Sequence, residues 1–363
     1  MPKTLRYNNT VPSNIYYSNT KVKKVYYDNT LVWSSSYEKH SSTSTTNLAI
    51  RYNTYNNHKG GSSSSYAFFS KGHSSSVGTA GNVTVFNKSL TKSNPAVSYL
   101  DTQCVSCENI GNYMVVGGGS IDDSNNASYN WAYEVYNLSS LTKSYATTKA
   151  YTTEAAASGN INNQIAVFYN TENGSNNIVY LGTSLTGSYK SRSYSVYSAC
   201  ATSITNYMLI GNMAINNDSG ETTQVHSLNS SMTDTTLTTG LSLARHAGAA
   251  ETVNNHAIFA GGENGYDTIH DTVDIYNSSL TRSVGTSLST AKKCMASAHT
   301  DSYAMFAGGY PTSNLAIDIY DTSLTHTFTV DTTCQRQGMI GASVGDYILF
   351  TGGGKTAVQI YSA

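Results

Sequence analysis

The chain has 363 residues, a formal net charge of −1 and only 12% charged side chains. A near-neutral balance excludes the strongly basic surface that proteins use to bind nucleic acid. No run of about 18 apolar residues is present, so we expect no membrane insertion, and no apolar stretch after Met1 indicates a secretory signal. The five cysteines are too few, and odd in number, for a disulfide framework.

Residues 1–33 form the first recognisable unit, which we call the N-terminal arm. Tyr-x-Asn-Thr segments recur at 7–10, 17–20 and 27–30, between short runs of β-branched and aromatic residues. Such spacing predicts strands joined by Asn and Asp turns. So short a segment cannot bury a core of its own, so the arm must dock on the rest of the chain or on a partner. Its candidate anchoring residues are Tyr16, Tyr17, Val25, Tyr26, Tyr27, Leu31 and Trp33.

A longer repeat fills residues 34–363. Each unit has a small-residue segment, an apolar run, a Val/Ile-Tyr run in most copies, and usually a Ser-Leu-Thr turn before a fourth segment. Four strands in a unit of 40 to 50 residues are typical of a β-propeller blade. The seven apolar runs begin at Tyr66, Tyr113, Gln164, Tyr207, His256, Tyr303 and Tyr347.

The seventh unit stops at its third strand, around Ile360-Tyr361. We therefore expect its outer strand to come from residues 34–46, followed by the inner strand of the first blade at 48–52. An N-terminal strand that completes the last blade would close the ring and remove the open sheet edges.

Three double glycines follow the apolar runs of the last three units, at 261–262, 308–309 and 352–353, and Arg245 and Arg336 precede two of the inner strands. On these residues, 34–363 resembles kelch-repeat propellers, although units three and four lack the double glycine and the fourth-strand Trp of that family is absent. The resemblance implies an all-β fold, a seven-bladed kelch-like β-propeller closed by an N-terminal strand, preceded by the small β-arm 1–33. We expect each glycine pair to permit positive φ and close approach of neighbouring blades.

No catalytic motif stands out in the sequence. The glycines at 117–119 lack a following Gly-Lys-Ser/Thr, and Cys104 and Cys107 lack the second pair that a zinc site needs. We expect no catalytic residue, no metal and no cofactor, and hence no enzyme. Glu108, Glu154 and Glu251 on the predicted inner strands nevertheless keep open the alternative of a carbohydrate-active propeller enzyme.

The loops between second and third strands emerge on one face of a propeller. Aromatic residues beside Asn, Asp and Glu in these loops are suited to grip sugars, and they also form good turns. We predict a ligand-binding rim for a host-surface glycan or protein. Its candidate residues are Asp122, Asp123, Tyr129, Trp131, Asn217, Asp218, Glu263, Tyr266, Asp267 and Tyr310.

Residues 22–33, which end in Leu31-Val32-Trp33, resemble a short module of bacteriophage tail and other virion proteins. The resemblance implies a virion structural protein (of tail, baseplate, fibre or capsid decoration) in multiple copies, with the arm bound to other virion subunits and the propeller displayed to the host. Such a protein leaves the cell by lysis. The alternative is a cellular kelch-type scaffold for protein interaction.

Overall fold

The computed structural model describes a β-protein and covers the following residues. They are 15–17, 20–22, 24–27, 30–34, 38–44, 60–69, 81–95, 97–98, 106–117, 130–150, 155–170, 176–185, 187–216, 219–265, 268–312, 316–334, 336–353 and 355–362. Within these ranges the helical content is one 3-10 turn, Thr332–Cys334. The described residues thus contain no helix that is long and apolar enough to cross a membrane.

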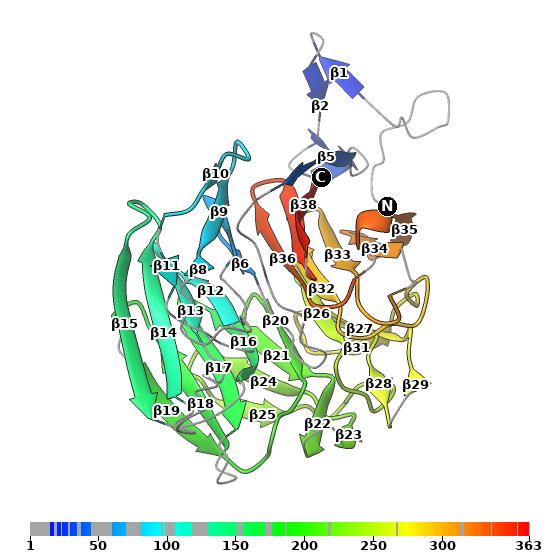
Figure 1. Ribbon diagram of the computed structural model, residues 1–363. Helices are drawn as coiled ribbons and strands as arrows, with labels where there is room; N and C mark the ends of the chain where they lie inside the picture. The colour runs from blue at the N-terminus through cyan, green and yellow to red at the C-terminus, as the bar shows by residue number, and fades with distance from the viewer. Residues whose placement is uncertain are drawn as a thin grey trace.

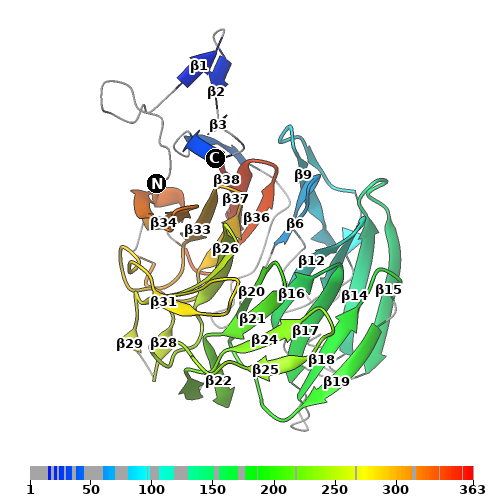
Figure 2. The same ribbon diagram turned by 180° about the vertical axis from the view of Figure 1, so that it is seen from behind.

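Seven four-stranded antiparallel sheets, the blades, follow one another around a central axis (Figure 1). Consecutive first strands contact one another all the way round, from β6 to β36 and back to β6, so they surround the axis. The view from behind shows the same order (Figure 2). The chain is therefore an all-β, seven-bladed β-propeller, as predicted.

The strand bounds of the first three blades are these. Blade one has β6 (Gly61–Ser62), β7 (Tyr66–Phe69), β9 (Thr84–Asn87) and β10 (Lys92–Ser93). Blade two has β12 (Ser106–Ile110), β13 (Tyr113–Gly117), β14 (Asn130–Asn137) and β15 (Lys143–Ala150). Blade three has β16 (Ala155–Ile161), β17 (Gln164–Asn170), β18 (Asn176–Leu181) and β19 (Gly187–Arg192).

The remaining blades have the same order. Blade four has β20 (Cys200–Ile204), β21 (Tyr207–Gly211), β24 (His226–Asn229) and β25 (Asp234–Thr236). Blade five has β26 (Ala249–Val253), β27 (His256–Ala260), β30 (Val273–Tyr276) and β31 (Arg282–Val284). Blade six has β32 (Ala296–His299), β33 (Tyr303–Ala307), β34 (Ala316–Asp321) and β35 (His326–Val330). Blade seven has β36 (Met339–Val344), β37 (Tyr347–Gly352), β38 (Lys355–Ser362) and β5 (Glu38–Ser44).

The ring closes at blade seven, where β5 pairs antiparallel with β38. The N-terminal strand thus supplies the missing outer strand, which confirms the predicted closure. Blade one then packs against blade seven through a hydrogen bond from the Gly60 amide to the Gly341 carbonyl (3.1 Å). A parallel bridge between Ser63 and Val344 lies beside it.

The predicted inner strand of blade one was wrong. Its inner strand is Gly61–Ser62, which pairs with β7, whereas residues 48–52 lie outside the described part of the chain. The reason is that little space is available near the axis. A Cβ on Gly60 would lie 2.4 Å from the Gly341 carbonyl oxygen, so this strand requires residues without bulk.

All seven predicted apolar runs form second strands, which begin at the predicted residues and are largely buried. Aromatic pairs join the second and third strands within blades, as in the edge-to-face contact of Phe259 with Tyr276 (5.9 Å between centroids). Other side chains pack between blades: Ile258 of blade five shares a core cluster with Phe306 of blade six. Burying a side chain of this size contributes about 1.5–3 kcal/mol. One third strand is offset, because Ser227-Leu228 rather than Val225-His226 match the Ile275-Tyr276 pair.

The Ser-Leu-Thr turns have a common geometry. In blade five the Asn277 side chain accepts hydrogen bonds from the amides of Ser279 and Thr281, both 3.0 Å, and Leu280 has a φ of 60°. Asp321 does the same for the amides of Ser323 and Thr325 in blade six. The Asx side chain stabilises the turn and offsets part of the strain of a left-handed leucine.

The double glycines lie where neighbouring blades meet. Gly261 and Gly308 have φ values of 61° and 67°. A Cβ on either would lie 2.4 and 2.6 Å from the carbonyl oxygens of Lys292 and Arg336, which precede the next blade's inner strand. Positive φ is confirmed for all three pairs, and close approach to the next blade is confirmed for the pairs of blades five and six. In blade four Asn212 takes the equivalent place with a φ of 54°.

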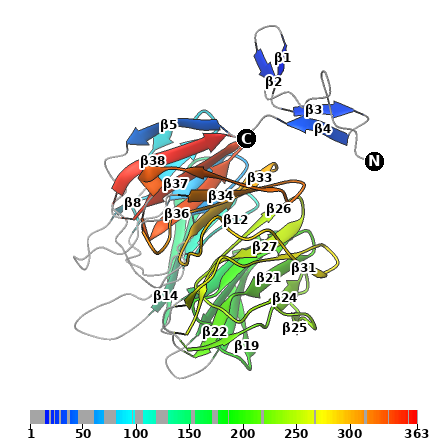
Figure 3. The ribbon, with the colours of Figure 1, turned by 90° about the vertical axis from the view of Figure 1, so that its right-hand side faces the viewer.

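The arm consists of two hairpins outside the blades (Figure 3). β1 (Ile15–Tyr17) pairs with β2 (Thr20–Val22), and β3 (Lys24–Tyr27) pairs with β4 (Thr30–Ser34). Their sheets contain no blade strand. β4 ends one residue past the predicted boundary at 33.

Candidate functional site

Only part of the predicted rim lies within the described residues. Glu263 and Tyr310 are described, and Trp131 lies on β14, where only its backbone is described. The other predicted rim residues lie outside the described ranges: Asp122, Asp123, Tyr129, Asn217, Asp218, Tyr266 and Asp267.

Three equivalent bridges fix the rim of blades four, five and six. Tyr197 pairs with Ala214, His246 with Glu263, and Lys293 with Tyr310. In each pair, a residue before the inner strand meets a residue after the second strand. The second-to-third-strand connections of these blades therefore share one face. They include two small hairpins, β22 (Met213–Asn216) with β23 (Ser219–Thr222) and β28 (Glu263–Asn264) with β29 (Thr268–Ile269). In blade one, β8 (Gly81–Asn82), which precedes the third strand, pairs instead with β11 (Val97–Ser98), which follows the outer strand.

Glu263 and Tyr310 belong to a set of interacting side chains that spans these blades. The set comprises Glu221, His246, Glu263, Lys293 and Tyr310, and we call it the rim network. His246 lies between two carboxylates, with its Nδ1 3.3 Å from Glu221 Oε1 and its Nε2 3.5 Å from Glu263 Oε1. The Lys293 ammonium contacts the other oxygen of Glu263. It also lies 5.6 Å from the centre of the Tyr310 ring.

The rim network presents one aromatic face to solvent. Tyr310 is 45% exposed, whereas Glu263 and His246 are buried. A cation over an aromatic ring contributes about 0.5–1 kcal/mol at an exposed site and holds the ring in place. An exposed ring held among polar groups is suited to stack on a sugar or on a partner's side chain.

The predicted anchor residues all lie on strands of the arm. Tyr16 and Tyr17 are in β1, Val25 to Tyr27 in β3, and Leu31 and Trp33 in β4. Val25 pairs with Trp33, and a register shift between Val25 and Tyr26 bulges the hairpin. The backbone thus brings the β3 and β4 positions together, whereas the side chains lie outside the description.

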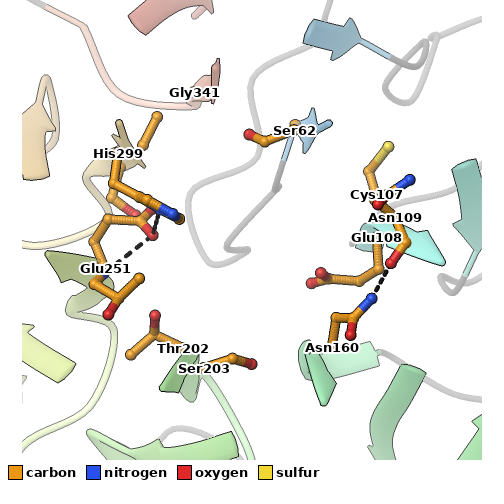
Figure 4. Close-up of a pocket in the computed structure, with 14 residues that line it drawn as sticks. Ser62, Cys107, Glu108, Asn109, Asn160, Thr202, Ser203, Glu251, His299 and Gly341 are labelled. Carbon is orange, nitrogen blue, oxygen red and sulfur yellow. Dashed lines mark hydrogen bonds and ion pairs between the residues drawn. The ribbon is translucent and has the colours of Figure 1, made fainter. Parts of the chain in front are cut away.

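A cavity of about 290 Å³ lies on the propeller axis (Figure 4). It is lined by residues at the first strands of all seven blades, and its described lining includes Cys107, Glu108, Glu251 and His299. The sequence placed the two glutamates on inner strands without assigning them to the site. Glu154, the third acid considered, lies outside the described residues.

One polar residue per blade, at equivalent positions, rings the axis; we call this set the polar ring. Four of its members follow one another as next-to-last residues of β12, β16, β20 and β26. The signal was present in the sequence, because the position is polar in every unit. The polar ring is Ser62, Asn109, Asn160, Ser203, Thr252, His299 and Ser343.

Side chains join neighbouring blades around the axis. Asn160 donates to the carbonyl of Asn109, Ser297 Oγ donates to the carbonyl of Ala250 (3.1 Å), and Ser62 Oγ accepts from the Ser343 amide (2.9 Å). These bonds satisfy polar groups at the inner edges of the sheets, where no further strand can pair.

The two axial carboxylates occupy equivalent positions in blades two and five and are differently partnered. Glu108 accepts a 2.7 Å hydrogen bond from Ser158 of blade three. Glu251 lies 2.6 Å from His299 Nδ1 of blade six and accepts from the Thr252 amide. His299 is 40% exposed although Glu251 is buried, so the pair connects the wall to the cavity.

No protein-family model and no curated protein matches the sequence. The fold is similar to that of solved structures. YjhT aligns at a TM-score of 0.57 and 13% identity, covering 78% of this chain and 99% of that one. A chain of the mitotic checkpoint complex gives 0.59 and 14%, covering 90% and 94%. Virginiamycin B lyase from Staphylococcus aureus gives 0.56 and 10%, covering 90% and 100%.

These identities show the fold alone. One of the three proteins is by its name a lyase, so the likeness gives no support to the expectation that this chain is not an enzyme. What strand pairing and comparison together establish is a seven-bladed β-propeller whose last blade is completed from the N-terminus.

Proposed function

We propose that the chain is a bacteriophage virion structural protein, anchored by residues 1–33 and displaying its propeller toward the host surface. The observation that carries the proposal is the separate pairing of the arm: β1 to β4 form two sheets of their own, and β5 then enters blade seven. An arm that continues directly into a blade strand would transmit an attachment to the whole ring.

The arm has the form of an attachment element. A two-stranded hairpin is at best marginally stable in water, so it gains most of its stability by docking. The apolar and aromatic anchor residues on β1, β3 and β4 would supply that contact. Other virion subunits are the proposed partners, with several copies of the chain in each particle.

The propeller would make the host contact through the rim. The exposed Tyr310 ring, held by Lys293 and the rim network, supports a role in binding glycan or protein. The predicted rim residues outside the described part belong to connections of the same type. We propose binding rather than catalysis for this face.

Deletion of residues 1–34 tests the anchor, because it removes both hairpins and keeps β5. We expect the truncated protein to remain folded by circular dichroism and to be absent from purified particles. Added in excess, it should still compete with intact particles for adsorption to host cells.

Deletion of residues 1–44 is the matched control. It also removes β5, leaves the β38 edge unpaired and should lower the midpoint of thermal unfolding. Normal incorporation of the 1–34 deletion would refute the anchor and favour the scaffold. A truncated propeller that folds but fails to compete would refute host binding.

A further inference from the structure

The small rim hairpin of blade five has an Asn-Gly pair at its turn. β28 ends at Asn264, which pairs with Thr268 of β29, and Gly265 begins the turn with a φ of 58°. The positive φ accounts for the glycine, because other residues are strained in that conformation. An asparagine directly before a glycine is in addition chemically reactive, because the glycine nitrogen carries no neighbouring side chain that would hinder its attack on the asparagine amide.

The reaction needs only these two residues and water. The Gly265 nitrogen loses its proton and attacks Asn264 Cγ, which closes a five-membered succinimide ring. The bond from Cγ to the side-chain nitrogen breaks, and ammonia leaves with a proton from the solvent. Water then opens the ring at either carbonyl, and the product is aspartate or isoaspartate.

Both reacting groups are accessible in the structure. Gly265 is exposed, and a Cβ there would meet no atom within 4 Å beyond its chain neighbours. The Asn264 side chain is partly exposed and makes no hydrogen bond within the described part of the chain. Asn277 is the contrast, since its side-chain oxygen accepts the amides of Ser279 and Thr281. The Asn264 side chain can therefore rotate toward the next nitrogen.

The Gly265 N–H is held by a side chain of the neighbouring blade. It donates a 3.1 Å hydrogen bond to Oε1 of Glu221, which lies on β23 of the blade-four hairpin. The same oxygen lies 3.3 Å from His246 Nδ1. The nitrogen cannot lose its proton or turn toward Asn264 Cγ without breaking the bond to Glu221, and the carboxylate also opposes the negative charge that develops on the nitrogen.

We propose that Asn264 is a site of spontaneous deamidation and that the Glu221 contact limits the rate. The reaction proceeds when the hairpins of blades four and five separate and release the Gly265 nitrogen. The product places a new carboxylate beside Glu263, and isoaspartate adds a carbon to the backbone at a residue that is paired with Thr268. Modification therefore changes the rim itself, and the inference does not depend on the proposed virion role.

Incubation of the folded full chain at mildly alkaline pH, followed by peptide mapping with mass spectrometry, tests the site. We expect the peptide that contains Asn264 to gain about 1 Da and to separate into aspartate and isoaspartate forms. Asn277, which is held by its turn, is the internal reference and should remain unmodified over the same time. An Asn264 that stays unmodified both in the folded chain and in the Glu221 variants overturns the proposal.

Two substitutions test the role of Glu221. Glu221→Ala removes the acceptor and should raise the deamidation rate about tenfold, which corresponds to the loss of a hydrogen bond to a charged group. Glu221→Gln keeps an oxygen acceptor and is the matched control, so its rate should stay nearer to that of the unmodified chain. Equal rates in the unmodified chain and in Glu221→Ala, both folded by circular dichroism, would refute the proposal.

The unfolded chain separates the effect of sequence from that of structure. Residues 172–174 repeat the Glu-Asn-Gly sequence of residues 263–265, so Asn173 and Asn264 should react at similar rates in urea. Folding should then slow the reaction at Asn264 about tenfold in the unmodified chain. The same rate at Asn264 in the folded and the unfolded chain would mean that the Glu221 contact does not limit the reaction, and the proposal would fail.

Discussion

Blades two and five show two ways of holding a buried acid on the third strand. Glu134 and Asp274 occupy equivalent positions, and each meets a cation of its own outer strand: Lys143 at 3.0 Å and Arg282 at 2.8 Å. Asp274 has in addition Arg245, which is fully buried before the inner strand and lies 2.8 Å from the carboxylate. In blade two the Tyr136 hydroxyl donates a hydrogen bond to Glu134, and the residues just before the inner strand lie outside the described ranges.

A buried cation before the inner strand is present in blades five, six and seven, where it meets Asp274, Asp318 and Gln359 respectively. Arg245 also donates to the Gly261 carbonyl (2.8 Å), and Arg336 donates to the Gly352 carbonyl (2.7 Å) and to Gln359. In blade six Lys292 takes this place beside Asp318, although the sequence had not indicated it. In blades five and seven the buried cation and the double glycine therefore form one unit, because the glycine carbonyl faces the guanidinium.

The third and fourth strands of blade two are longer than those of blade five. The third and fourth strands of blade two have 8 residues each, and those of blade five have 4 and 3. Blade two thus relies on longer pairing between its strands, whereas blade five fixes short strands with a buried charge. We expect substitutions at the two sites to differ accordingly.

The largest effect is expected for Arg245→Met. The substitution leaves Asp274 with Arg282 as its remaining described cation and also removes the Arg245 hydrogen bonds to the Gly261 and Phe259 carbonyls, so we expect a cost of about 3–5 kcal/mol. Lys143→Met in blade two, where the lysine is partly exposed, should cost about 1–2 kcal/mol. Urea unfolding followed by circular dichroism measures both, and equal losses would remove the distinction between the blades.

A smaller loss of folding stability is expected for Gly308→Ala. The φ of 67° strains any other residue by about 1–3 kcal/mol, and the new Cβ would also meet the Arg336 carbonyl oxygen at 2.6 Å. Gly111→Ala is the matched control, since its φ is 54° but its nearest neighbouring atom is 4.0 Å away. If both variants lose the same stability in thermal unfolding, backbone strain alone explains the glycine and blade contact does not.

The smallest effect concerns acid sensitivity in blade six. Burial raises the pKa of Asp318, but hydrogen bonding from His326 and the nearby Lys292 charge outweigh it, so the pKa lies below its usual value. A depressed folded-state pKa contributes stability that is fully present above the unfolded pKa of about 3.9 and is lost as pH falls through the folded value.

Thermal unfolding from neutral pH down to about pH 2 should therefore show a shallower acid decline for Asp318→Asn than for the unmodified chain. The exposed Asp301→Asn serves as the control and should follow the unmodified chain. If the midpoint of thermal unfolding falls equally with pH in all three proteins, Asp318 does not control the loss of stability in acid.

Local sequence patterns predicted most of the fold. The starts of the seven second strands, the Ser-Leu-Thr turns and the outer strand of blade seven were all predicted, because apolar periodicity and turn residues act over a few residues. The inner strand of blade one was misplaced, because Gly61-Ser62 has too little side chain to show a period. Its place follows from packing against Gly341 across the closure.

The candidate site shows the same difference between what local sequence patterns predict and what tertiary packing adds. Sequence patterns were sufficient to place Glu263 and Tyr310 after second strands, Glu108 and Glu251 on first strands, and Arg245 and Arg336 before first strands. The contacts of Lys293 with Glu263 and Tyr310, and of Glu251 in blade five with His299 in blade six, arise from tertiary packing and were not predicted. The contacts of Lys293 with Glu263 and of Glu251 with His299 cross between blades, and their partners lie 30 and 48 residues apart in the sequence. Ring closure sets their distances, and no short-range pattern encodes it.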